Sequence, residues 1–86
     1  MKAKCRSQSG TKTELAVLDI SSIGCMVDRV AWTAKPDERI LIQLEGLSFQ
    51  PARVVWVEDE RVGIELEELL HETVLERLKG LIASAA

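Results

Sequence analysis

The stretch that decides the fold is ARVVWVEDERVGIEL, residues 52–66. It holds an apolar run with strong β propensity at 54–57, a charged turn at 58–60 and a second strand-like run at 61–66. Only a short turn separates the two runs, so the helix that a parallel crossover requires has no place between them. The stretch therefore predicts two consecutive antiparallel strands.

The same rhythm of strands and short turns extends back to the N-terminus. A turn is expected at 8–11, where Gly10 can take a positive φ, and a loop from Asp28 to Pro36 contains Trp32. Strands alternating with turns, without intervening helices, favour an antiparallel barrel or sandwich. The segments expected as strands are 2–7, 12–20, 25–27, 39–44, 47–57 and 61–66.

The C-terminal segment breaks this rhythm, because its apolar residues recur at helical spacing. They are Leu70, Val74, Leu78, Leu81 and Ile82. We expect a helix over about 68–83 that caps an open end or side of the barrel, which itself covers about 2–66. A chain of 86 residues can build one modest core, so we expect one domain over 1–86.

Composition and charge limit the classes of partner. No apolar run approaches the roughly 20 residues that cross a bilayer, and the first residues do not resemble a signal peptide, so we expect a cytoplasmic protein without a membrane span. The net charge of −3 disfavours nucleic acid as a partner. The cations near the N-terminus, which include Lys2, Arg6 and Lys12, form either a solvated surface or a basic arm for a small anion.

Residue types that carry catalysis are sparse. The single histidine, His71, stands at the start of the expected helix, and the two cysteines, Cys5 and Cys25, lack the spacing of metal ligands. We interpret the cysteines as reduced, half-buried strand residues. The chain has neither a Walker-type loop nor a GxGxxG motif. We therefore expect no enzyme activity, no metal and no cofactor.

One turn carries chemistry that suits a nucleobase. The segment DISSIG, residues 19–24, places a carboxylate, a hydroxyl and a glycine between two expected strands. The Asp19 carboxylate can accept from the N1–H and amino groups of guanine, the Ser21 hydroxyl can bond beside it, and Gly24 allows close backbone approach. The alternative is that Asp19 and Ser21 bond the backbone of their own turn and Gly24 only shapes it.

The motif D-x-S-x-x-G between two strands resembles a signature of the PilZ domain, a bacterial receptor for cyclic di-GMP. The strands at 52–57 and 61–66 and the terminal helix also resemble that family, so the resemblance covers residues 3–80. It implies a six- or seven-stranded antiparallel β-barrel with one C-terminal α-helix. It further implies that Asp19 and Ser21 read a guanine edge while Gly24 keeps the turn open to the ligand.

The second PilZ signature, an R-x-x-x-R arm ahead of the first strand, is matched poorly. The nearest match runs from Lys2 to Arg6, with lysine in place of the first arginine and inside the expected first strand. Trp56 either stacks on a ligand or packs in the protein. The resemblance implies a cyclic di-GMP signalling receptor or adaptor with weak or absent ligand binding in this chain. The alternative is a ligand-independent module that contacts a protein partner through a strand edge or the terminal helix.

Overall fold

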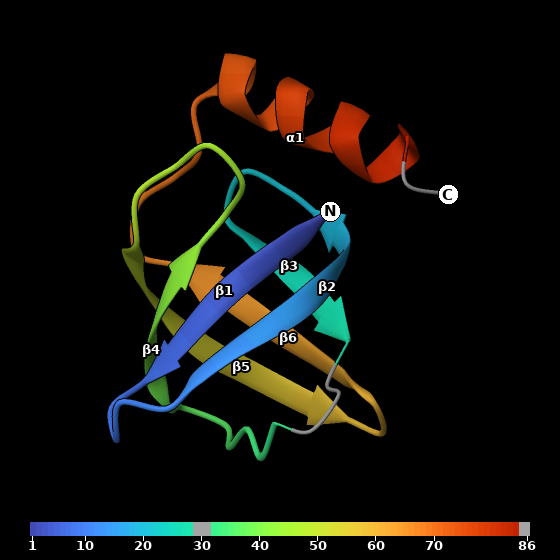
Figure 1. The fold of residues 1–86 in the computed structure, drawn as a ribbon. Helices are drawn as coiled ribbons and strands as arrows, with labels where there is room; N and C mark the ends of the chain where they lie inside the picture. Colours follow the sequence, from blue (N-terminus) through green and yellow to red (C-terminus); the bar gives the residue numbers. More distant parts are fainter. Residues whose placement is uncertain (29–31, 85–86) are drawn as a thin grey trace.

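Six strands form a closed antiparallel barrel in the computed structural model, which describes residues 1–28 and 32–84 (Figure 1). Around the barrel the order is β1-β2-β3-β6-β5-β4, and the pairing of β1 with β4 closes it. The strands are β1 (Lys2–Ser7), β2 (Lys12–Ile20), β3 (Gly24–Asp28), β4 (Arg39–Gln43), β5 (Gln50–Glu58) and β6 (Arg61–Leu66). The predicted fold class is confirmed, with six strands in the described ranges.

Period-two alternation fixes which side chains fill the barrel. In β1, Ala3 and Cys5 point inward and are buried, whereas Lys2, Lys4 and Arg6 are exposed. The other strands supply much of the rest of the core, including Leu15, Val27, Ile42, Val54 and Val62. Each of the six strands pairs with a neighbour on both sides, but not along its whole length: residues 12–16 of β2 pair with β1 and not with β3.

Both cysteines belong to this core, more deeply than the half-buried positions expected. The exposed fraction is 2% for Cys5 and 7% for Cys25. Both are free thiols. Burial raises the pKa of each thiol to about 12, with smaller contributions from the charge of Glu38 on Cys5 and of Cys5 on Cys25. Thiols in this environment are protonated and poor nucleophiles.

The helix α1 (Glu72–Ser84) lies across one end of the barrel (Figure 1). Leu78 is fully buried on its inner side, and the partly buried residues Val74, Leu75, Leu81 and Ile82 pack against the core. Arg77 adds a polar contact, because its Nη2 donates to the carbonyl oxygen of Glu45 at 3.0 Å. Within the described residues, no helix is long and apolar enough to cross a membrane.

The helix begins at Glu72, later than the expected start near residue 68. The preceding residues are bound to the β2–β3 turn: the Leu66 amide donates to the Ile23 carbonyl and the Leu70 amide to the Ser22 carbonyl, each at 2.8 Å. His71 then covers the start of the helix, where its Nδ1 accepts from the Thr73 amide at 3.2 Å. The lone histidine thus has a structural role.

Candidate ligand-binding site

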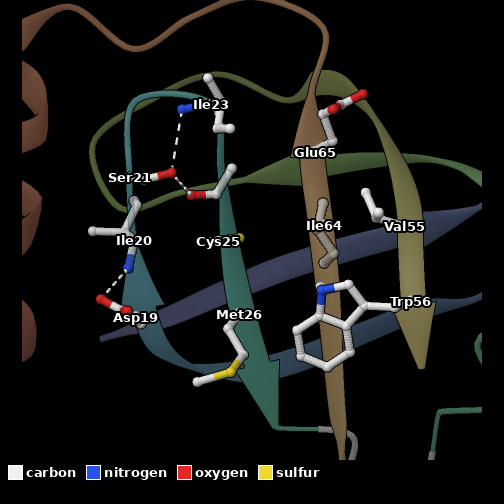
Figure 2. A pocket seen from close by; sticks show the side chains of 12 residues that line it. Asp19, Ile20, Ser21, Ile23, Cys25, Met26, Val55, Trp56, Ile64 and Glu65 are labelled. Atoms are coloured by element: carbon white, nitrogen blue, oxygen red, sulfur yellow. Dashed lines mark hydrogen bonds between the residues drawn. The ribbon is translucent and has the colours of Figure 1, made fainter. Parts of the chain in front are cut away.

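Four strands place one outward row of residues across the barrel wall. Asp19 of β2 is paired with Met26 of β3, Met26 with Gly63 of β6, and Gly63 with Trp56 of β5. Asp19 and Trp56 are exposed, and Met26 is half-buried between them. The row therefore brings a carboxylate and an indole from distant parts of the sequence onto one face (Figure 2).

Two irregularities in the sheet create this row. The register of β2 against β3 shifts between Val17 and Asp19, and that of β5 against β6 shifts between Val54 and Trp56. An extra residue in a strand sends two consecutive side chains outward. Leu18 and Asp19 are accordingly both exposed, as are Val55 and Trp56, with Leu18 at 39% and Val55 at 42%.

The row borders an open depression of about 390 Å³ on the barrel surface. Its walls come from the β2–β3 turn on one side and from β5 and β6 on the other (Figure 2). Carboxylate, hydroxyl, thiol, thioether, aliphatic and indole groups line it, and within residues 1–28 and 32–84 neither lysine nor arginine does so. The lining residues are Asp19, Ile20, Ser21, Ile23, Gly24, Cys25, Met26, Val55, Trp56, Gly63, Ile64 and Glu65.

Asp19 and Ser21 both bond to their own turn. Asp19 Oδ1 accepts from the Ile20 amide at 2.9 Å, while Ser21 Oγ donates to the Gly24 carbonyl and accepts from the Ile23 amide, each at 3.4 Å. These contacts orient the two side chains and leave Asp19 Oδ2 without a protein partner among the described residues. The carboxylate can thus accept from a ligand while it stays anchored to the turn.

Gly24 is required by the packing of two backbones. A Cβ at this position would overlap the carbonyl oxygen of Ile64 in β6, the residue paired with the neighbouring Cys25. The residue is buried although it lines the depression. Any larger side chain would push β3 away from β6, so glycine at this position allows the two strands beneath the depression to pair.

Gly63 leaves space for the indole ring of Trp56. A Cβ on residue 63 would overlap Nε1 and Cε2 of the ring and would stand 2.8 Å from Cδ1. The ring therefore lies across the glycine, and Trp56 keeps 37% of its surface exposed. Trp32, in contrast, is 8% exposed and belongs to the core.

The two basic residues expected at the site lie elsewhere. Lys2 borders a depression with Gln43 and Leu47, where it forms an ion pair with Glu14 at 3.3 Å. Arg6 borders another depression with Arg39. Of the six residues predicted for ligand binding, the structure gathers Asp19, Ser21, Gly24 and Trp56 and places Lys2 and Arg6 outside.

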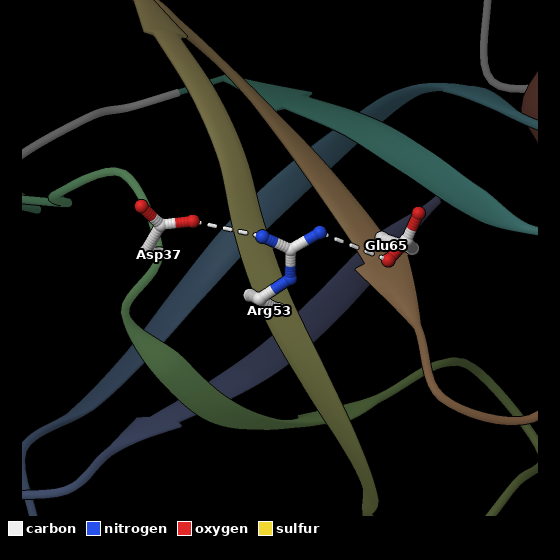
Figure 3. Close-up of polar contacts among 3 residues, drawn as sticks. All are labelled: Asp37, Arg53 and Glu65. Carbon is white, nitrogen blue, oxygen red and sulfur yellow. Dashed lines mark hydrogen bonds and ion pairs between the residues drawn. The ribbon is translucent and has the colours of Figure 1, made fainter.

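The guanidinium of Arg53, which contacts one of the lining residues, is paired with two carboxylates. Arg53 of β5 donates through Nη2 to Glu65 Oε1 at 3.2 Å and through Nη1 to Asp37 Oδ1 at 2.8 Å (Figure 3). The hydrogen bond to Glu65, then its charge and the contacts with Asp37, raise the pKa of Arg53. Glu65 lines the depression, so the positive charge beside this rim is compensated.

The comparison with protein families now decides the class of the domain. The sequence model of the PilZ domain family matches residues 1–84, which is nearly the whole chain. The chain belongs to the PilZ family. No curated protein matches it. PilZ domains form a family of cyclic di-GMP receptors and adaptors, and they are generally binding domains without catalytic activity.

In this PilZ domain the sequence reasoning missed several lining residues, among them Met26, Val55 and Gly63. A signal for Gly63 was present, because an isolated glycine inside a strand pattern indicates a bulge or a close approach. For Val55 no such signal was present, because this residue is exposed only through the register shift in β5. Within residues 1–28 and 32–84, no group of three or more His, Cys, Asp or Glu side chains could hold a metal ion.

Proposed function

We propose that this PilZ domain works as a receptor or adaptor in cyclic di-GMP signalling, not as an enzyme, and that residues 1–86 alone bind cyclic di-GMP weakly or not at all. The observation that carries the proposal is the outward row from Asp19 to Trp56, which joins a carboxylate and an exposed indole at one depression. The depression suits one part of the ligand and lacks a counterpart for the other.

The guanine base is the part that fits. A carboxylate oxygen of Asp19 can accept from the N1–H and the exocyclic amine of guanine, and the Ser21 hydroxyl can bond beside it. The indole of Trp56 offers a flat face for stacking on the fourth strand of the row, three strand spacings from Asp19. Ile23 and Val55 add apolar surface around the base.

The two phosphates are the part without partners. The strong protein contacts to a phosphodiester are charge-assisted, often bidentate, hydrogen bonds from arginine. Among the described residues the depression has no cation in its lining, and Arg53 beside it already bonds Glu65 and Asp37. Without two arginine contacts the binding free energy becomes less favourable by several kcal/mol. Each 1.4 kcal/mol is about a tenfold change in the dissociation constant.

Isothermal titration calorimetry tests this proposal. Residues 1–86 are titrated with cyclic di-GMP beside a version extended ahead of Met1 by a short segment with two arginines at R-x-x-x-R spacing. We expect millimolar or undetectable binding for the first and micromolar binding for the second, abolished by Asp19→Ala. Glu60→Ala, which removes an exposed carboxylate of the β5–β6 turn, is the matched control and should leave the affinity unchanged.

Two results would redirect the proposal. Tight binding by residues 1–86 themselves would show that the cations within this chain suffice. Absence of binding even with the added arginines would favour the alternative, a ligand-independent module that contacts a protein. The supporting observation for this alternative is that the described residues lining the depression include no cation. A third function, nucleic-acid binding by a small barrel, is opposed by the net charge of −3, and binding to a labelled oligonucleotide at moderate salt would revive it.

A further inference from the structure

A second surface, on the other side of the barrel, concentrates positive charge. We name it the β1–β4 face: the outward residues of β1 and β4 with the adjoining first residues of β2 and the residues where β5 begins. In this face Arg6 is paired with Lys12 and Leu41, Leu41 with Pro51, and Lys4 with Glu14 and Gln43. Its residues are Lys2, Lys4, Arg6, Lys12, Glu14, Arg39, Leu41, Gln43, Phe49 and Pro51.

This face is positively charged, whereas the whole chain has a negative net charge. The face holds five of the eleven Lys and Arg residues and one of the fourteen Asp and Glu residues, although the net charge of the chain is −3. Glu14 neutralises Lys2 at 3.3 Å. The other four cations have no carboxylate within ion-pair distance among the described residues. They are Lys4, Arg6, Lys12 and Arg39.

Exposed apolar side chains lie among these cations. Leu41 is 38% exposed and borders, with Arg6 and Arg39, a depression of about 370 Å³ that Glu67 also lines. Phe49 is 40% exposed and borders, with Lys4 and Lys12, a second depression of about 380 Å³. Each depression thus combines two cations, one carboxylate and one large exposed apolar side chain, and β1 contributes to both. The carboxylate is that of Glu67 in the first and of Glu14, which is paired with Lys2, in the second.

We propose that the β1–β4 face docks an acidic segment of a partner protein, whose carboxylates pair with the four cations and whose apolar side chains enter the two depressions. Charge and apolar complementarity favour this occupant. Arginine and lysine pair with anions, and Leu41 and Phe49 pack against apolar groups. A peptide can supply both, whereas the phosphate backbone of a nucleic acid supplies only the anions. A membrane surface is disfavoured by the acidic remainder of the domain, which anionic lipids would repel.

This docking surface is separate from the depression at Asp19 and Trp56. That depression is lined by residues of β2, β3, β5, β6 and the β2–β3 turn, and neither β1 nor β4 contributes. A partner on the β1–β4 face would leave the candidate ligand site open, so one domain could hold both at once. The proposal therefore stands whether or not residues 1–86 bind cyclic di-GMP.

Fluorescence anisotropy with a defined probe tests the surface. The probe is a fluorescein-labelled peptide of about twelve residues that alternates Glu with Leu and Phe, compared with peptides in which Gln replaces Glu or Ser replaces Leu and Phe. We expect the first peptide alone to bind, more weakly at higher salt, and Arg6→Gln with Arg39→Gln to weaken it by about tenfold or more. Leu41→Ser with Phe49→Ser should weaken it as well.

The matched control removes two exposed cations away from this face, through Arg61→Gln in β6 and Lys79→Gln in α1, and should bind within about twofold of the parent. Thermal melts verify that every variant is folded. The proposal is overturned if the acidic peptide does not bind at millimolar concentration, if the Arg6 and Arg39 variant binds it as the parent does, or if the Gln peptide binds equally well. Tighter binding of an oligothymidine or of phosphatidylglycerol vesicles would overturn it in favour of nucleic acid or membrane.

Discussion

The indole of Trp56 lies across Gly63, its direct partner on the neighbouring strand, and occupies the space that any side chain at residue 63 would need. The position of the exposed indole at the candidate site therefore depends on residue 63 of β6 having no side chain. The bulge in β5 turns Trp56 outward, and Gly63 lets its ring lie flat against the sheet.

Gly63→Ala tests this relationship. The added methyl group overlaps the indole ring, so we expect the ring to be displaced and the domain to lose about 1–3 kcal/mol of unfolding free energy, the usual cost of overpacking. Urea denaturation measures the loss, and the indole N–H resonance of Trp56 reports the displacement. An unchanged resonance together with unchanged stability would show that the ring does not rest on Gly63.

The same substitution at Gly80 is the control. A Cβ at Gly80 meets no atom within 4 Å, and the residue lies inside α1. Alanine is the better helix former by about 1 kcal/mol, so Gly80→Ala should stabilise the domain by up to that amount. A loss of stability here would mean that α1 is not helical through residue 80.

Leu78 should be the residue through which α1 contributes most to stability. It is fully buried at the end of the barrel, whereas its neighbour Lys79 is exposed. We expect Leu78→Ala to cost about 2–5 kcal/mol and Leu78→Asp several kcal/mol more, because the aspartate would be an unpaired charge in the core. Lys79→Ala should stay within about 0.5 kcal/mol in the same urea titration. Equal midpoints for all three variants would contradict the docking of α1.

Periodicity explains why much of this fold could be predicted. Strands and helix carry different spacings of apolar residues, and each hairpin carries its own turn signal, as with Gly10, which takes φ +89° between β1 and β2. The start of α1 was misplaced because hydrogen bonds of Leu66 and Leu70 to the β2–β3 turn, which depend on tertiary structure, keep residues 66–70 out of the helix.

The candidate site was harder to predict, because it depends on register. Alternation along β5 leaves open whether the set with Trp56 or the set with Val55 faces inward, and the structure follows neither: Ala52 and Val54 are buried, and then the bulge exposes both Val55 and Trp56. A bulge is a property of two paired strands, so one strand's own sequence does not reveal it. The motif at Asp19 was visible because its residues are adjacent in the chain.

The two buried cysteines give the domain an alkaline limit of stability. Burial raises the pKa of both thiols to about 12 from 9, so each folded thiol holds its proton at a pH where the unfolded one has lost it. This contribution to stability is complete below pH 9 and is lost as the pH rises toward 12. Each thiol lowers the unfolding free energy by at most about 1.4 kcal/mol per pH unit in that range.

Urea denaturation at several pH values between 8 and 11 measures this slope. Replacing both residues, through Cys5→Ala and Cys25→Ala, should flatten the decline above pH 9 relative to the parent, although the cavities lower the absolute stability. Parallel pH curves for parent and double variant would show that the thiols are not what titrates.

Nuclear magnetic resonance mapping of cyclic di-GMP on the ¹⁵N-labelled domain tests the central claim, that the row from Asp19 to Trp56 is the ligand face. With millimolar ligand we expect fast-exchange shifts at the amides of Asp19, Ser21 and Ile23 and at the Trp56 indole N–H, a dissociation constant in the millimolar range, and none of these shifts in Asp19→Ala. Shifts centred on Arg6 and Arg39 instead, or saturation at micromolar ligand, would contradict the account.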